Sequence, residues 1–394
     1  MFELKQNNII EVDHHQIAKE GQFVSGDIFL SQKIKEDERI ISVLSDGLGS
    51  GIKASVLATL TATMALKYMS NKTDIRSSAE IIMNTLPICS VRKISYSTFT
   101  IVDIDHCGKT RIIEHGNPPY VFIRAGNEVP VEKQVITLHK WSDRLIHYSE
   151  LEMKLGDRIV FFSDGVSQAG MGRPGTPVGW GKGVTDHLVQ CLRVDKDMSA
   201  CSMARSIVRK ALWMDSKGAL DDITCGVIYL RRPRKLLIVT GPPYAPDRDA
   251  SLAQFIDEFP GRKVLSGGTT ANIIARELDR DIEMVADCCV PGIPPTASME
   301  GIDLVTEGAL TLGRVAIMLE NSIAPDEEAR DAVSRLLSMM LDSDVVYFVV
   351  GTRINEAHQN PDITVDFDLR RNIVRRIAGQ LEKQHCKETQ IKYI

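Results

Sequence analysis

Short apolar runs separated by Gly and Asn-Pro turns dominate the first 230 residues of the chain. The runs at residues 40–44, 97–104, 111–115, 119–123, 158–162 and 223–230 have the length and composition of β-strands. Two longer stretches, residues 50–69 and 198–214, instead repeat apolar residues at helical spacing. Strands clustered between long helices predict an α+β layered domain and not a βαβ repeat.

The pattern changes after residue 235. Continuous apolar runs at 236–240, 263–265, 284–285, 304–305 and 345–350 alternate with helical stretches near 249–258, 270–278 and 326–341. This alternation predicts a smaller α/β domain with a mostly parallel sheet covered on both faces. The basic, proline-containing segment Arg231-Arg232-Pro233-Arg234-Lys235 separates the two patterns. We therefore expect one domain over residues 1–231 and a second over residues 235–394.

Composition excludes several classes of function. The net charge of -5 and the absence of a long basic run argue against binding to nucleic acid or an anionic membrane. No apolar stretch approaches the roughly 20 residues that a membrane-spanning helix needs, and the N-terminus lacks the features of a secretion signal. The eight cysteines are scattered, without a Cys-x-x-Cys pair. These features predict a cytoplasmic protein with reduced thiols.

Four short acidic turns carry the candidate chemistry. They contain Asp27, Asp46, Asp164 and the pair Asp221-Asp222, and each lies at the beginning or end of a predicted strand. Carboxylates at strand ends can converge in space, and an all-oxygen site without Cys or His ligands suits Mg²⁺ or Mn²⁺. Taken singly, each motif also fits an ordinary turn or a helix cap.

Taken in order, the motifs resemble a known family. Residues 24–27 (Val-Ser-Gly-Asp), 43–51 (Val-Leu-Ser-Asp-Gly-Leu-Gly-Ser-Gly), 161–166 (Phe-Phe-Ser-Asp-Gly-Val) and 221–224 (Asp-Asp-Ile-Thr) are similar to the metal-dependent serine/threonine protein phosphatases of the PPM superfamily. The nearest branch is the bacterial one typified by the stage II sporulation protein E (SpoIIE) phosphatase domain. The resemblance covers about residues 21–230.

The resemblance implies a fold, a site and an activity. The fold would be a two-sheet antiparallel β-sandwich flanked by helices. Two Mn²⁺ or Mg²⁺ ions would be held by Asp27, Asp46, the Gly47 carbonyl, Asp164 and Asp221, with Asp46 bridging them and Asp222 orienting water. A water activated by the metal pair would hydrolyse phosphoserine or phosphothreonine on a partner protein, such as an anti-sigma-antagonist. The helix at 50–69 would act as a regulatory switch.

The second domain contains one candidate ligand site, Ser266-Gly267-Gly268-Thr269-Thr270, between a predicted strand and a helix. Such a segment can bind a phosphate through backbone N–H groups and the helix dipole, and it also fits a glycine turn with Thr capping. Residues 240–243 and 303–308 are expected to line the same crevice. We expect a sensor of a small phosphorylated ligand that controls the phosphatase, with a docking platform for the protein substrate as the alternative.

A different class of function remains open for the whole chain. A protein of this fold could be a catalytically silent module that senses a ligand or binds a partner. The presence of all the main acidic residues favours the enzyme. The sequence leaves open whether the protein forms a homodimer.

Overall fold

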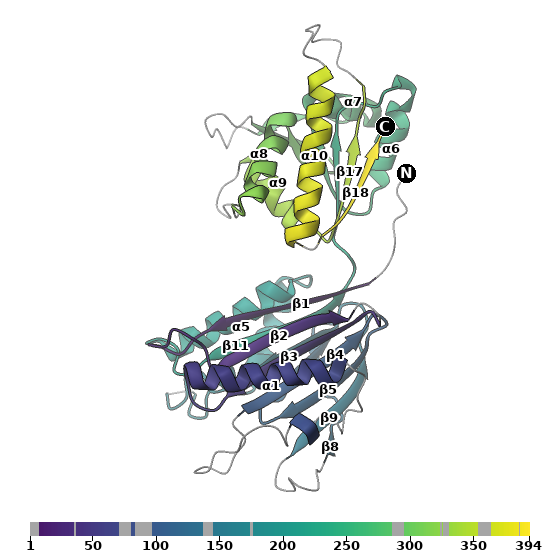
Figure 1. Cartoon of the computed structure of the whole chain (residues 1–394). Helices are drawn as coiled ribbons and strands as arrows, with labels where there is room; N and C mark the ends of the chain where they lie inside the picture. Colours follow the sequence, from purple (N-terminus) through teal and green to yellow (C-terminus); the bar gives the residue numbers. More distant parts are fainter. Residues whose placement is uncertain are drawn as a thin grey trace. The chain divides into compact units, whose positions relative to one another are not determined.

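The computed structural model describes residues 8–34, 37–70, 80–82, 97–136, 145–173, 176–285, 295–323, 325, 331–353, 364–385 and 387–394. In the helix that begins at residue 364, the side chains are described from residue 370 onward. The chain divides into two compact units, the first covering residues 7–232 and the second covering residues 233–394 (Figure 1). Within the described ranges, no helix has the length and apolarity that are needed to cross a membrane.

Two antiparallel sheets form the N-terminal unit. The six-stranded sheet has the order β2 (Asp27–Ile34), β3 (Arg39–Gly47), β4 (Ser97–Asp105), β5 (Lys109–His115), β9 (Ile146–Glu152) and β8 (Gln134–Ile136). The five-stranded sheet has the order β1 (Ile9–Ile17), β11 (Ile223–Arg231), β10 (Arg158–Phe162), β6 (Val121–Arg124) and β7 (Asn127–Glu128). Every strand pair in both sheets is antiparallel.

The core of this unit lies between the two sheets. Leu44 and Val102 of one sheet pack in the same buried cluster as Phe161 and Ile228 of the other. Each strand alternates its side chains, so the opposite faces of both sheets are also apolar and need a cover. Helix α1 (Ile52–Ser70) covers the six-stranded sheet, while α4 (Gly183–Val194) and α5 (Ala200–Asp215) cover the five-stranded sheet (Figure 1). The predicted antiparallel sandwich is confirmed.

Helix α1 packs through small residues. Its fully buried positions include Ala54, Ala58, Ala62 and Ala65, whose short side chains let the helix approach the sheet closely. The larger residues Leu57, Met64 and Tyr68 are only half-buried, at the margins of this contact. The close approach matters because α1 follows directly on the Asp46-Gly47 turn.

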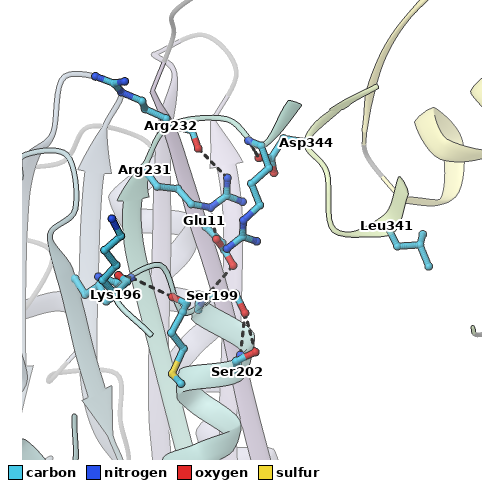
Figure 2. A network of polar contacts seen from close by, with 12 residues as sticks. Glu11, Lys196, Ser199, Ser202, Arg231, Arg232, Leu341 and Asp344 are labelled. Carbon is cyan, nitrogen blue, oxygen red and sulfur yellow. Dashed lines mark hydrogen bonds and ion pairs between the residues drawn. The ribbon is translucent and has the colours of Figure 1, made fainter. Parts of the chain in front are cut away.

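A partly buried carboxylate ties the end of β11 to the start of α5. Glu11 of β1 accepts a hydrogen bond from the backbone N–H of Ala200 at 2.9 Å and also binds the guanidinium of Arg231 (Figure 2). The Ser199 hydroxyl caps α5 by accepting from the N–H of Ser202 at 3.1 Å. These contacts fix the five-stranded sheet against its covering helix.

The C-terminal unit contains one seven-stranded sheet. Its order is β14 (Glu283–Val285), β15 (Thr296–Met299), β16 (Ile302–Thr306), β13 (Arg262–Ser266), β12 (Lys235–Thr240), β17 (Val345–Val350) and β18 (Glu388–Tyr393). The five strands from β16 to β18 are parallel, and β14 and β15 form an antiparallel edge. The predicted, mostly parallel sheet is confirmed.

Helices cover both faces of this sheet. A 3₁₀ turn, η1 (Pro246–Arg248), precedes α6 (Asp249–Glu258), which packs with α7 (Gly268–Leu278) on one face, against Leu237 and Val239. On the other face, α8 (Ala309–Glu320), α9 (Ala332–Leu341) and α10 (Thr364–His385) pack against Leu236 and Ile238 (Figure 1). Neighbouring residues of β12 therefore point to opposite helical layers, as expected for a buried parallel strand.

Gly379, in the interior of α10, offers a test of this packing. Within the described ranges, no atom outside the adjoining helix backbone lies within 4 Å of the position that a Cβ would occupy there. Glycine in a helix costs about 0.5–1 kcal/mol relative to alanine because more backbone freedom is lost on folding. We expect Gly379→Ala to raise the free energy of unfolding of the C-terminal unit by about that amount, measured by urea denaturation. A lower free energy of unfolding would mean that the space beside the helix is filled.

Candidate metal centre

Strands β2 and β3 bring Asp27 and Asp46 together. The two residues are directly opposite each other in the antiparallel register, and the N–H of Gly47 donates to the Gly26 carbonyl at 3.2 Å. Directly opposed residues have Cβ atoms about 4.5–5.5 Å apart. Asp27 is only 1% exposed, and within the described part of the chain neither of its carboxylate oxygens accepts a well-formed hydrogen bond, although the hydroxyls of Ser163 and Thr224 lie nearby. A buried carboxylate without donors is costly unless a positive charge compensates it.

The ends of β10 and β11 supply the other carboxylates. The N–H of Ser163 donates to the Thr224 carbonyl at 3.0 Å, which holds the two strand ends side by side. Asp164 follows at once and opens the short helix α3 (Asp164–Ser167), where its carboxylate accepts from Gln168 Nε2 at 3.0 Å. Asp221 is half-buried and lies 3.6 Å from Lys19 Nζ.

Backbone contacts fix these four segments against one another. A Cβ on Gly47 would lie 2.1 Å from the carbonyl oxygen of Ala54 in α1, and one on Gly165 would lie 2.2 Å from that of Asp222. Both approaches are therefore possible only for glycine. The glycine that follows each of Asp46 and Asp164 allows the close approach of main chains at this end of the sandwich.

Asp222 holds the loop that precedes β2. One of its carboxylate oxygens accepts from the N–H of Lys19 at 3.0 Å and the other accepts from the N–H of Gly26 at 2.9 Å. Both oxygens are therefore engaged with backbone donors. In this structure Asp222 positions the residue just before Asp27, and its predicted role in orienting water remains a prediction.

Thr224, the second residue of β11, lies near Asp27 and lowers the pKa of that carboxyl group. Its hydroxyl is buried, and among the described residues it makes no well-formed hydrogen bond. The sequence also gave no sign of Lys19, the cation beside Asp221, because it lies outside the four acidic motifs.

The carboxylates raise one another's pKa. Burial raises the pKa of Asp46 to about 9, and the charges of Asp27, Asp164, Asp221 and Asp222 add to the rise. Burial likewise raises the pKa of Asp27 to about 7, opposed by the nearby hydroxyls of Ser163 and Thr224 and assisted by Asp222 and Asp164. Burial and then Asp221 raise the pKa of Asp164. Residues from both sheets thus share one electrostatic environment that disfavours further negative charge.

This donor set fits divalent cations. All the candidate ligands are oxygens, which suits Mg²⁺ or Mn²⁺, and the buried Asp27 carboxylate accepts no well-formed hydrogen bond from the described residues. Among the residues that the structure describes, however, no three His, Cys, Asp or Glu side chains lie close enough to hold a metal ion as they stand.

The residues predicted for a ligand site in the C-terminal unit lie at one edge of the parallel sheet. Ser266, the last residue of β13, is aligned with Thr306 of β16 and Thr240 of β12. Gly267 follows as the N-cap of α7, and Gly268, Thr269 and Thr270 form its first turn. Asp303 lies apart from this edge, near the start of β16, where it accepts from the N–H of Lys263 at 2.7 Å. Its expected place in the crevice was wrong.

A comparison with protein families decides the identity of the N-terminal unit. Residues 36–231 match the family described as stage II sporulation protein E (SpoIIE). The N-terminal unit belongs to the SpoIIE family. This family is one of PPM-type protein phosphatases, as the motifs around Asp46 and Asp164 indicated.

Solved structures with similar folds include SpoIIE itself. One is the phosphatase domain of Bacillus subtilis SpoIIE with a fragment of its regulatory domain, which is 18% identical to this chain with a TM-score of 0.47. The match covers 58% of this chain and 64% of the SpoIIE chain, so it spans less than two thirds of that relative. The RsbU and RsbW domains of a Mycobacterium tuberculosis protein have 16% identity and a TM-score of 0.44, over 64% and 68% of the two chains. RsbX in complex with magnesium has 19% identity and a TM-score of 0.40, over 58% and 100%. A comparison with curated proteins found no match.

Proposed function

We propose that this protein is a metal-dependent serine/threonine protein phosphatase that dephosphorylates a partner protein. Membership of the SpoIIE family supports the reaction class. The observation that carries the proposal is the convergence of Asp27, Asp46 and Asp164, from separate segments, in one environment where burial and mutual repulsion raise their pKa values. A protein fold tolerates such a group of carboxylates when cations bind there.

Two Mn²⁺ or Mg²⁺ ions would be held by Asp27, Asp46, the Gly47 carbonyl, Asp164 and Asp221. When bound, such a pair supplies positive charge that polarises the phosphate, together with a water of lowered pKa. The chain itself supplies the rigid support. Asp46 and Gly47 are held by the packing of β3 against α1, and Asp222 holds the loop before Asp27. A small phosphoprotein of the anti-sigma-antagonist type is the proposed substrate.

Removal of the cations gives the direct test. We expect the full chain to hydrolyse p-nitrophenyl phosphate and a phosphoserine peptide in Mn²⁺ or Mg²⁺, to lose this activity in EDTA, and to regain it when excess Mn²⁺ is added. Phosphate release measures the rate, and circular dichroism before and after EDTA verifies that the fold persists. A folded protein that is inactive in both cations would contradict the proposal and favour a silent binding module.

A further inference from the structure

Strands β13 and β16 end beside each other and send their helices to opposite faces of the sheet. The N–H of Gly267 donates to the Thr306 carbonyl at 2.9 Å, and a Cβ on Gly308 would lie 3.3 Å from the Cα of Gly267. Helix α7 then packs on one face and α8 on the other. Crevices that bind ligands in parallel sheets form where adjacent strands diverge in this way, at their carboxyl ends.

The two helices begin alike. Each has a glycine N-cap without a side-chain cap and a threonine three residues later, Thr270 in α7 and Thr311 in α8. Both threonines are only 1% exposed, and neither hydroxyl has a hydrogen-bond partner among the residues that the structure describes. Buried hydroxyl groups are normally satisfied, so a missing partner at a helix N-terminus points to a ligand that supplies it.

The carboxylate of Glu307 already occupies one of these two N-termini, that of α8. The carboxylate of Glu307 accepts from the N–H of Leu310 at 3.3 Å, so an internal anion already lies at the start of α8. At the start of α7, no described side chain caps the helix, and the space beside Gly268 is open, since no atom of the described residues lies within 4 Å of a Cβ placed there. The Thr270 hydroxyl faces this turn, 3.5 Å from the position of a Cβ on Gly267.

We propose that the first turn of α7 binds the phosphoryl group of a small molecule. The backbone N–H groups of Gly268 and Thr269 and the Thr270 hydroxyl would donate to phosphate oxygens, and the helix dipole would favour the negative charge. The open space beside Gly268 admits the ligand to the backbone. This site lies wholly within the C-terminal unit and is independent of the proposed phosphatase activity.

Phosphate titration of the metal-free full chain tests the site. With EDTA present, cation-dependent binding of phosphate at the aspartate cluster makes no contribution. Calorimetry would measure binding of inorganic phosphate and, separately, of ribose 5-phosphate; tighter binding of either one identifies the source of the phosphoryl group. We expect measurable binding that shifts the backbone amide resonances of Gly268 and Thr269. Absence of binding by both probes overturns the proposal.

Three matched variants separate a ligand site from a structural turn. Thr270→Val keeps the shape and removes only the hydroxyl, so we expect an unchanged fold with at least tenfold weaker binding. Thr311→Val makes the same change in the first turn of α8, where the N–H of Leu310 already donates to Glu307, and binding should stay within twofold. Glu307→Gln removes a nearby negative charge and should strengthen binding severalfold. Equal affinities in wild type and Thr270→Val, or equal losses in Thr270→Val and Thr311→Val, would overturn the assignment.

Discussion

Replacing Asp46 by Asn is expected to lower kcat for p-nitrophenyl phosphate by more than about 100-fold, since loss of even an outer partner of a metal ligand costs about 10–100-fold. Asn has nearly the same shape but carries no charge, so it cannot bridge two cations as a carboxylate does. Asp46 is also the residue whose pKa is influenced by all four other aspartates of the cluster. Its loss should therefore reduce cation binding as well as the rate.

Thermal denaturation measures the cation binding separately. A ligand that binds only the folded state raises Tm, by an amount that grows with its concentration relative to Kd. We expect Mn²⁺ to raise the Tm of the wild-type N-terminal unit and to have little effect on Asp46→Asn. Asp186→Asn, at an exposed position of α4, is the control that should keep both activity and the Mn²⁺ effect. Activity of Asp46→Asn within a few-fold of wild type would show that the ligand assignment is wrong.

Strong local patterns made much of the fold predictable. The run Arg158–Phe162 and the helix Asp249–Glu258 have the predicted bounds, because each is a clear apolar or amphipathic segment between turn residues. The sequence missed α8 and β18. Gly313 interrupts the helical pattern of α8, and β18 (Glu388–Tyr393) is an edge strand of mostly polar residues. Its position is set by parallel pairing with β17, a tertiary contact without a local signal.

The candidate site was predictable in its residues but not in their partners. Motif order identified Asp27, Asp46 and Asp164, which the structure brings to one end of the sandwich. The hydrogen bonds from the backbone of Lys19 and Gly26 to Asp222 could not be predicted, because these residues lie more than 190 positions away from Asp222 in the sequence. In the same way, no local pattern distinguishes a glycine that turns the chain from one that allows two main chains to touch.

Gly47→Ala is expected to lower the free energy of unfolding of the N-terminal unit by about 1–3 kcal/mol, as overpacking of a tight core does. Gly47 lies at the end of β3 and is not among the residues with positive φ, so alanine can adopt its backbone conformation. The new Cβ would meet the Ala54 carbonyl oxygen at 2.1 Å. The Ala54 carbonyl belongs to the main chain and cannot move aside as a flexible side chain would, so β3 and α1 must move apart.

That movement should also affect the metal centre, because the displaced segment carries Asp46 and the Gly47 carbonyl. We expect weaker Mn²⁺ binding, seen as a smaller rise of Tm with added Mn²⁺, beyond the loss of stability seen by urea denaturation. Gly379→Ala is the matched control, since the same methyl group enters open space there. If Gly47→Ala kept wild-type stability and Mn²⁺ affinity, the contact between Gly47 and Ala54 would not determine the geometry of the site.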